Sequence, residues 1–133
     1  EIEKRIRSVY ERFPMLEEKR HQSARTLSGG QQQMLVMGRS LVLNPSIILL
    51  DEPSLGLAPK IVDQIFEIVS LFKQSGMTVL IVEQNAVKGL ECADWGCVLD
   101  LGKNSFDGPA DSILTDKRIQ ELYLGSRKDR TND

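Results

Sequence analysis

The sequence predicts an α/β fold in which parallel β-strands are flanked by helices. Two short and continuously apolar runs, residues 47–50 and 78–82, are typical of strands that are buried on both faces of a sheet. Between them, apolar residues recur at helical spacing over residues 60–73, and Gly76 ends this helix. A strand, a helix and a second strand in this order form a βαβ unit, whose two strands are parallel.

Composition and charge are those of an ordinary globular domain. The 133 residues carry 17 Lys and Arg against 19 Asp and Glu, a net charge of −2 with the one histidine neutral. We expect no nucleic-acid partner, because contacts to phosphates require a basic face. The two cysteines, Cys92 and Cys97, are too few for a disulfide scaffold and indicate a reducing compartment. No apolar run approaches the roughly 18 residues that a membrane-spanning helix needs.

Two helical segments precede the first strand. Residues 1–20 carry one apolar stripe, and its helix is expected to end before Pro14. The second helix is predicted over residues 28–43, with Ser28 as its N-cap and Asn44-Pro45 as its end. Four of its positions are expected to face inward: Met34, Leu35, Gly38 and Leu41.

The part of the chain that follows the second strand contains shorter elements. A helix is predicted over residues 87–93, followed by a hairpin of residues 97–101 and 105–108 with its turn at 102–104. Two short helices, 110–114 and 116–124, then lead to a polar C-terminal tail.

Acidic and amide side chains follow both strands. Asp51 and Glu52 come directly after the first strand, and residues 83–85 follow the second. Ligands of open parallel sheets bind beyond the carboxyl ends of the strands. Carboxylate oxygens suit Mg²⁺, and an adjacent acid can polarise a water molecule. Taken alone, this pattern is equally compatible with a solvated strand end.

The start of the second helix is a candidate phosphate site. Ser28 is followed by Gly29, Gly30 and Gln31, and two glycines at a helix N-terminus leave backbone N–H groups open to an anion. The same four residues also fit a tight turn.

Together, the two motifs resemble the ATP-binding-cassette (ABC) ATPases. Residues 27–31 read LSGGQ and match the signature motif of that family, and residues 47–53 read IILLDEP and match its Walker B motif. Residues 54–58 stand at the position of its D-loop. The resemblance implies the C-terminal part of a P-loop NTPase-like ABC ATPase domain. Residues 1–26 would end the helical subdomain, 27–125 would belong to the ATPase core and 126–133 would form the polar tail.

The resemblance also implies roles for individual residues, with ATP and Mg²⁺ as ligands. Asp51 would hold Mg²⁺ through water, and Glu52 would orient and deprotonate the attacking water. The segment 28–31 would bind the nucleotide, with Ser28, Gly29 and Gly30 contacting the γ-phosphate of ATP on the opposite subunit of a head-to-tail dimer. Phosphoryl transfer depends mainly on positioning and charge stabilisation, which such groups supply.

The sequence departs from the family pattern in two places. None of its 10 glycines has another glycine five positions later, so the P-loop pattern Gly-x-x-x-x-Gly-Lys-Ser/Thr does not occur, and the Q-loop is missing too. We therefore expect the C-terminal portion of a longer subunit, which alone neither binds ATP tightly nor hydrolyses it. Gln84 stands where most members have a histidine; it can position a phosphate or water but cannot shuttle a proton.

The details of these motifs resemble the ATP-binding subunits of branched-chain amino acid importers most closely, through residues 50–59, 82–86, 93–99 and 123–125. This resemblance implies a prokaryotic subunit on the cytoplasmic face of the membrane, partnered by a second ATP-binding subunit and by permease subunits. Importers of urea and short-chain amides have similar subunits. Two alternatives remain open, a soluble ABC ATPase without a permease and a non-catalytic interaction fragment.

Overall fold

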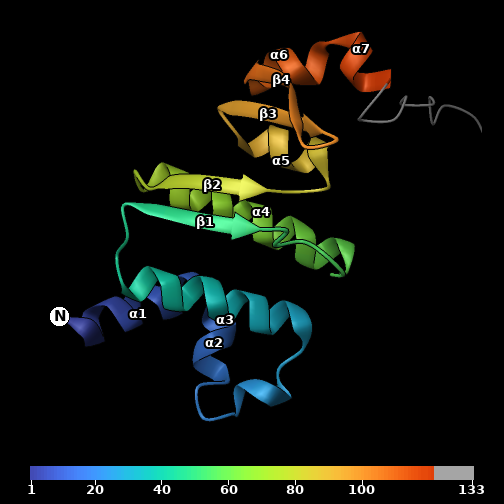
Figure 1. The fold of residues 1–133 in the computed structure, drawn as a ribbon. Helices are drawn as coiled ribbons and strands as arrows, with labels where there is room; N and C mark the ends of the chain where they lie inside the picture. The colour runs from blue at the N-terminus through green and yellow to red at the C-terminus, as the bar shows by residue number, and fades with distance from the viewer. Residues whose placement is uncertain (122–133) are drawn as a thin grey trace, which may run out of the picture. The chain divides into compact units, whose positions relative to one another are not determined.

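The computed structural model describes residues 1–121 and divides the chain into two compact units, Glu1–Val82 and Glu83–Asp133. The elements of the first unit are α1 (Ile2–Arg12), α2 (Pro14–Glu18), a 3₁₀ turn (Ala24–Thr26), α3 (Gly29–Val42), β1 (Ile47–Asp51), α4 (Pro59–Gln74) and β2 (Thr78–Val82). Those of the second are α5 (Ala86–Cys92), β3 (Trp95–Asp100), β4 (Lys103–Pro109), α6 (Ala110–Thr115) and α7 (Lys117–Ile119). Figure 1 shows their order along the chain. None of the helices in this range is long and apolar enough to cross a membrane.

The predicted parallel strand pair is present in the first unit. β1 and β2 pair in parallel from Ile47 opposite Thr78 to Asp51 opposite Val82. Helix α4 packs on one face of this pair and carries much of the core, with its buried side chains at Ile65, Phe66, Ile68, Val69 and Phe72.

Only one face of the strand pair is covered, which corrects the expectation of burial on both faces. Ile48 is buried, whereas Ile47, Leu49, Leu80 and Val82 on the opposite face are more than half exposed. The physical reason is that, within the first unit (residues 1–82), one helix layer packs on the pair and the second layer of a doubly covered sheet is not supplied.

Helix α3 packs closely on the helices before it. A side chain at Gly38 would lie 2.9 Å from Cδ1 of Leu16 and 3.0 Å from Cγ1 of Val9, so a glycine is needed for this approach. The centre of the buried stripe is Met37, which is 1% exposed. Of the four positions predicted to face inward, Gly38 is buried and Met34, Leu35 and Leu41 are only half-buried, because the preceding helices approach α3 most closely at Gly38.

The second unit is a hairpin packed on short helices. Its core consists of Leu90, Ala110, Ile113 and Ile119. β3 and β4 are antiparallel, and Asp100 pairs with Lys103.

The hairpin turn is therefore the two-residue step Leu101–Gly102, one residue earlier than predicted. Both turn residues have positive φ, 47° and 77°, which is the conformation that matches the twist of a two-residue hairpin. The predicted helix over residues 116–124 is observed as α7, and its part beyond residue 121 lies outside the described residues. The segment 123–125 and the predicted tail 126–133 lie outside them as well.

Candidate functional site

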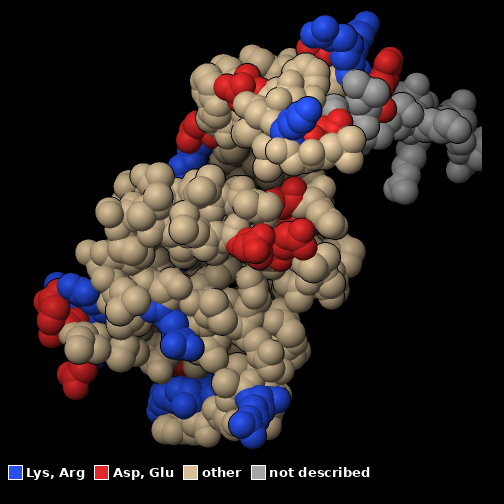
Figure 2. Space-filling model, viewed as in Figure 1, with Lys and Arg blue, Asp and Glu red and all other residues tan. Residues whose placement is uncertain are grey.

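The two candidate carboxylates lie together at the carboxyl end of β1. Asp51 is the last residue of the strand and is exposed, and Glu52 follows it and is half-buried. The backbone N–H of Glu52 donates to the carbonyl of Val82 at 2.8 Å, so this residue is tied to the end of the neighbouring strand. In the view of Figure 1, Figure 2 shows acidic side chains gathered over the end of β1. This is the sheet edge at which the sequence predicts ligand chemistry.

Glu52 has an unusual backbone conformation. Its φ is +43°, in the left-handed region that residues with a Cβ seldom adopt. Such a conformation costs roughly 1–3 kcal/mol and persists where the surroundings fix it, as at many functional sites. The bond to Val82 at one end, and the turn in which Leu55 N–H donates to Glu52 O at 3.1 Å, supply that constraint.

The turn that leads from Glu52 to α4 is compact. Ser54 is 9% exposed and is the one buried polar residue of the described chain, and Pro53 beside it is buried. The N–H of Leu57 donates to Ser54 O at 3.2 Å, and Gly56 has a φ of +72°. This segment is thus a folded turn that connects the strand-end carboxylates directly to the first turn of α4.

The amino terminus of α3 forms a complete capping box. Ser28 Oγ accepts from the N–H of Gln31 at 3.4 Å, and Gln31 Oε1 accepts from the N–H of Ser28 at 3.0 Å. The Gln31 side chain is therefore used to hold the helix start. A serine followed three residues later by glutamine is itself a sequence signal of this box.

Two backbone N–H groups between Ser28 and Gln31, at the start of α3, are unpaired in the described part of the chain. Across residues 1–121, no hydrogen bond engages the N–H of Gly29 or Gly30. Gly29 is exposed and Gly30 is buried. Unpaired N–H groups at the positive end of a 14-residue helix attract anions.

Gln84, the remaining predicted site residue, belongs to the second unit. It is exposed in the connection between β2 and α5, and its carbonyl accepts from the N–H of Ala86 at 2.8 Å. Its neighbours are structural: Asn85 caps α5 by accepting from the N–H of Lys88 at 3.3 Å, and Glu83 Oε1 accepts from the N–H of Asn85 at 3.1 Å. The structure thus places six of the seven predicted site residues in the first unit and Gln84 in the second.

The donor set fits a magnesium ion shared with a nucleotide rather than a cage made by protein alone. Among residues 1–121 no group of three or more His, Cys, Asp and Glu side chains is arranged to hold a metal. Mg²⁺ is usually held by one or two carboxylates together with phosphates and water. The exposed carboxylate of Asp51 at the strand end meets that requirement.

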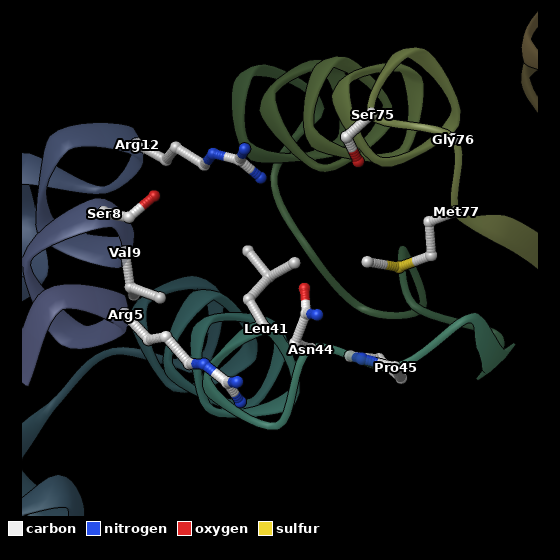
Figure 3. Close-up of a pocket in the computed structure, with 10 residues that line it drawn as sticks. All are labelled: Arg5, Ser8, Val9, Arg12, Leu41, Asn44, Pro45, Ser75, Gly76 and Met77. Carbon is white, nitrogen blue, oxygen red and sulfur yellow. The ribbon is translucent and has the colours of Figure 1, made fainter. Parts of the chain in front are cut away.

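A separate pocket of about 200 Å³ lies between α1, the end of α3 and the turn before β2. Figure 3 shows Arg5 and Arg12 reaching into it from α1. Arg5 Nη1 donates to the carbonyl of Val42 at 3.2 Å, and Nη2 pairs with the Glu1 carboxylate at 3.3 Å. Arg5 therefore has a structural role, because its positive charge stabilises the carbonyl end of α3. The sequence pattern gave no sign of this contact.

Comparisons with known proteins agree with the two motifs. The sequence model described as "ABC transporter" matches residues 1–55. The chain is 48% identical to the high-affinity branched-chain amino acid transport ATP-binding protein BraG of Pseudomonas aeruginosa, over 88% of the chain and 50% of that protein. It is 36% identical to the probable branched-chain amino acid transport ATP-binding protein LivF of Archaeoglobus fulgidus, over 94% of the chain and 53% of that protein.

Part of a solved structure has a similar fold. The ADP conformation of MJ1267, an ATP-binding cassette of an ABC transporter, superposes with a TM-score of 0.74 at 30% identity, over 93% of this chain and 50% of that one. The chain spans about half the length of the relatives that it matches. The predicted fold class is confirmed, and the described elements correspond to part of such a cassette.

Proposed function

We propose that this chain belongs to an ATP-binding cassette of the ABC transporter family and forms part of the ATP-hydrolysing subunit of a branched-chain amino acid importer. The similarity to BraG over 88% of the chain supports the choice of solute class. The observation that carries the proposal is the pair of carboxylates at the end of β1, held by the bond from Glu52 N–H to Val82 O.

The carboxylates take different roles in this proposal. Asp51, exposed at the strand end, holds Mg²⁺ through water. The carboxylate of Glu52 orients and deprotonates the water that attacks the γ-phosphate. The fixed backbone of Glu52 favours this role, because a general base must be held within hydrogen-bond reach of its proton. Gln84 holds the phosphate or the water through its amide without exchanging a proton.

The amino terminus of α3 supplies the other half of the site. Ser28, Gly29 and Gly30 bind the γ-phosphate of an ATP held by a second ATP-binding subunit, using the open N–H groups and the helix dipole. Gln31 acts through its side-chain bond to Ser28, which keeps the helix start in place. Permease subunits complete the assembly, and the subunit lies on the cytoplasmic face of the membrane.

The decisive experiment is ATP hydrolysis by the complete subunit together with its permease in lipid vesicles. Glu52→Gln is expected to lower kcat at least about 100-fold, because it removes the general base. Glu67→Gln is the matched control, since it makes the same change at an exposed position of α4. Equal rates for Glu52→Gln and the wild type would contradict the assignment.

Gln84→Ala is expected to lower turnover by a smaller factor, and an unchanged rate would remove Gln84 from the site.

The solute and the need for a complete subunit can be tested separately. Vesicles should take up leucine, isoleucine and valine in an ATP-dependent manner, and excess urea or acetamide should not compete. Competition by the amides would favour the urea and amide importers instead.

The 133-residue chain alone is expected to show no ATP hydrolysis. Magnesium-dependent turnover that Glu52→Gln abolishes would show that the chain is sufficient.

A further inference from the structure

The amino termini of α3 and α4 are in close contact, and the two glycines of α3 differ there. A Cβ atom added to Gly30 would lie 2.6 Å from Cγ2 and 3.3 Å from Cγ1 of Ile61. A Cβ atom added to Gly29 would meet only Cδ2 of Leu57, at an ordinary contact distance of 3.8 Å. A side chain therefore fits at position 29 and does not fit at position 30.

Ile61 has little freedom to make room. It lies in the first turn of α4, and its N–H donates to the carbonyl of Ala58 at 2.8 Å. The clashing atom Cγ2 is attached directly to Cβ, and a β-branched side chain in a helix has one strongly preferred χ1 rotamer. Relief of the clash therefore requires the two helix starts to move apart, from 2.6 Å to at least 3.4 Å between these atoms.

We infer that Ile61 is a positioning residue, which sets the distance of the α3 amino terminus from α4, and that position 30 is glycine because Ile61 leaves no room for a Cβ atom. This inference rests on the proposed function, in which the open amides of Gly29 and Gly30 face a phosphate. Within the signature segment, Gly29 leaves its flank open to a ligand, and Gly30 permits the close packing that holds both amides in place.

The contact also links the start of α3 to the segment of the same chain that carries Asp51 and Glu52. Leu57 lies in the turn that follows Asp51 and Glu52, Ile61 lies in the first turn of α4, and both approach the start of α3. This packing brings the turn into direct contact with the start of α3, where the proposed phosphate-binding amides lie. The group in contact with phosphate is the α3 backbone, and Ile61 acts only through it.

The first test is a double-mutant cycle on stability in the complete subunit. Alanine is a better helix former than glycine, so a loss of stability in Gly30→Ala can only reflect the clash. We expect Gly30→Ala to lower the folding equilibrium constant at least about tenfold, and Gly29→Ala to leave it within about threefold. In the Ile61→Ala background, which removes both γ carbons, Gly30→Ala should cost less than about threefold.

Ile61→Val is the matched control, because valine keeps both γ carbons and removes only Cδ1. Gly30→Ala should remain about as costly in that background as in the wild type. If Gly30→Ala does not fold at all, recovery of folded protein in Gly30→Ala with Ile61→Ala is the same result. Equal costs of Gly30→Ala in the wild-type, Ile61→Val and Ile61→Ala backgrounds would overturn the inference.

The second test measures ATP hydrolysis with the same variants. Gly30→Ala should lower kcat at least about tenfold, and Ile61→Ala should restore kcat to within about threefold of Ile61→Ala alone, whereas Ile61→Val should not restore it. Restored stability without restored kcat would contradict a positioning role for Ile61. A complete subunit that hydrolyses no ATP would refute the proposed function, and the stability cycle would still decide whether Ile61 imposes glycine at position 30.

Discussion

The two units of the chain differ in how their cores are built. In the first unit, the buried side chains include three phenylalanines, Phe13 between α1 and α2, and Phe66 and Phe72 on α4. Among the described residues of the second unit, 83–121, the buried core cluster is Leu90, Ala110, Ile113 and Ile119, contributed by α5, α6 and α7. Burial of large aromatic side chains contributes more free energy, so the first unit has the stronger core.

The difference affects how rigidly the residues of the proposed site are held. Asp51, Glu52 and the amino terminus of α3 are fixed to strands and helices that are packed around α4. Gln84 lies in an exposed connection at the start of the second unit. Side chains on rigid elements are held to tighter positions than side chains on connections. We therefore expect amide hydrogen exchange in the complete protein to be slower in β1, β2 and α4 than in β3 and β4.

The largest effect is expected for Phe72→Ala. Phe72 is 0% exposed, and its replacement by alanine leaves a cavity that costs about 3–5 kcal/mol of unfolding free energy. The control is Leu71→Ala, the neighbouring residue on α4, which is 44% exposed and should cost far less. Chemical denaturation of the complete subunit measures both. Similar losses for the two variants would mean that α4 is not the centre of the core.

A smaller effect, confined to the second unit, is expected for Gly96→Ala. A Cβ atom there would lie 2.5 Å from Cδ2 of Leu90 and 2.9 Å from Cδ1 of Ile113. Both atoms are the ends of flexible side chains, so overpacking should cost about 1–2 kcal/mol. Gly108→Ala, on the partner strand, meets nothing within 4 Å and is the control. Faster hydrogen exchange in β1 and β2 as well as in the second unit would show that the two cores unfold together.

Much of the framework could be predicted from local sequence patterns. The apolar runs of residues 47–50 and 78–82 predicted the parallel pair of β1 and β2, and Ser28 predicted the start of α3. These features succeed because strand-forming apolar runs and N-caps are encoded within a few residues, whereas the burial of both strand faces, which depends on other layers, was predicted wrongly. The placement of Asp51 and Glu52 at the carboxyl end of β1 follows from the same pattern, and their catalytic roles remain predictions.

The features that the sequence missed depend on contacts between distant segments. Leu101 occupies a turn position with positive φ, which leucine disfavours, because the pairing of Asp100 with Lys103 imposes it. The centre of the buried stripe on α3 is Met37 and not one of the predicted positions, because other helices pack on α3 at the adjacent Gly38. Likewise, no local pattern indicates the backbone strain at Glu52 or the contact between Gly30 and Ile61.

Ser28→Ala should weaken the helix start in the first unit by about 1 kcal/mol, because it removes the side-chain acceptor of the Gln31 N–H. Ser28→Asp retains an acceptor and should recover most of this loss. Ser40→Ala is the control on the same helix, since its hydroxyl donates only to Val36 O, four residues back. Chemical denaturation measures the unfolding free energy of both variants. An equal loss for Ser40→Ala and Ser28→Ala would show that the Ser28 cap makes no specific contribution to stability.

The smallest effect is expected at Asp116, in the second unit. A side-chain hydrogen bond from Arg118, together with the Arg118 backbone N–H, lowers the pKa of this carboxyl below its ordinary value. A lowered pKa in the folded state means that the stabilisation is present above the ordinary pKa of aspartate and is lost as the pH falls through the folded-state pKa.

Arg118→Gln should move the pKa of Asp116 upward but not all the way to its ordinary value, because the backbone N–H groups of residues 118 and 119 still donate to it. NMR titration of the Asp116 carboxyl measures this shift. Because the pair is exposed, added salt should weaken the side-chain part of the effect and leave the backbone part. A pKa of Asp116 that is the same in Arg118→Gln and in the wild type would assign the whole shift to the backbone N–H groups of residues 118 and 119.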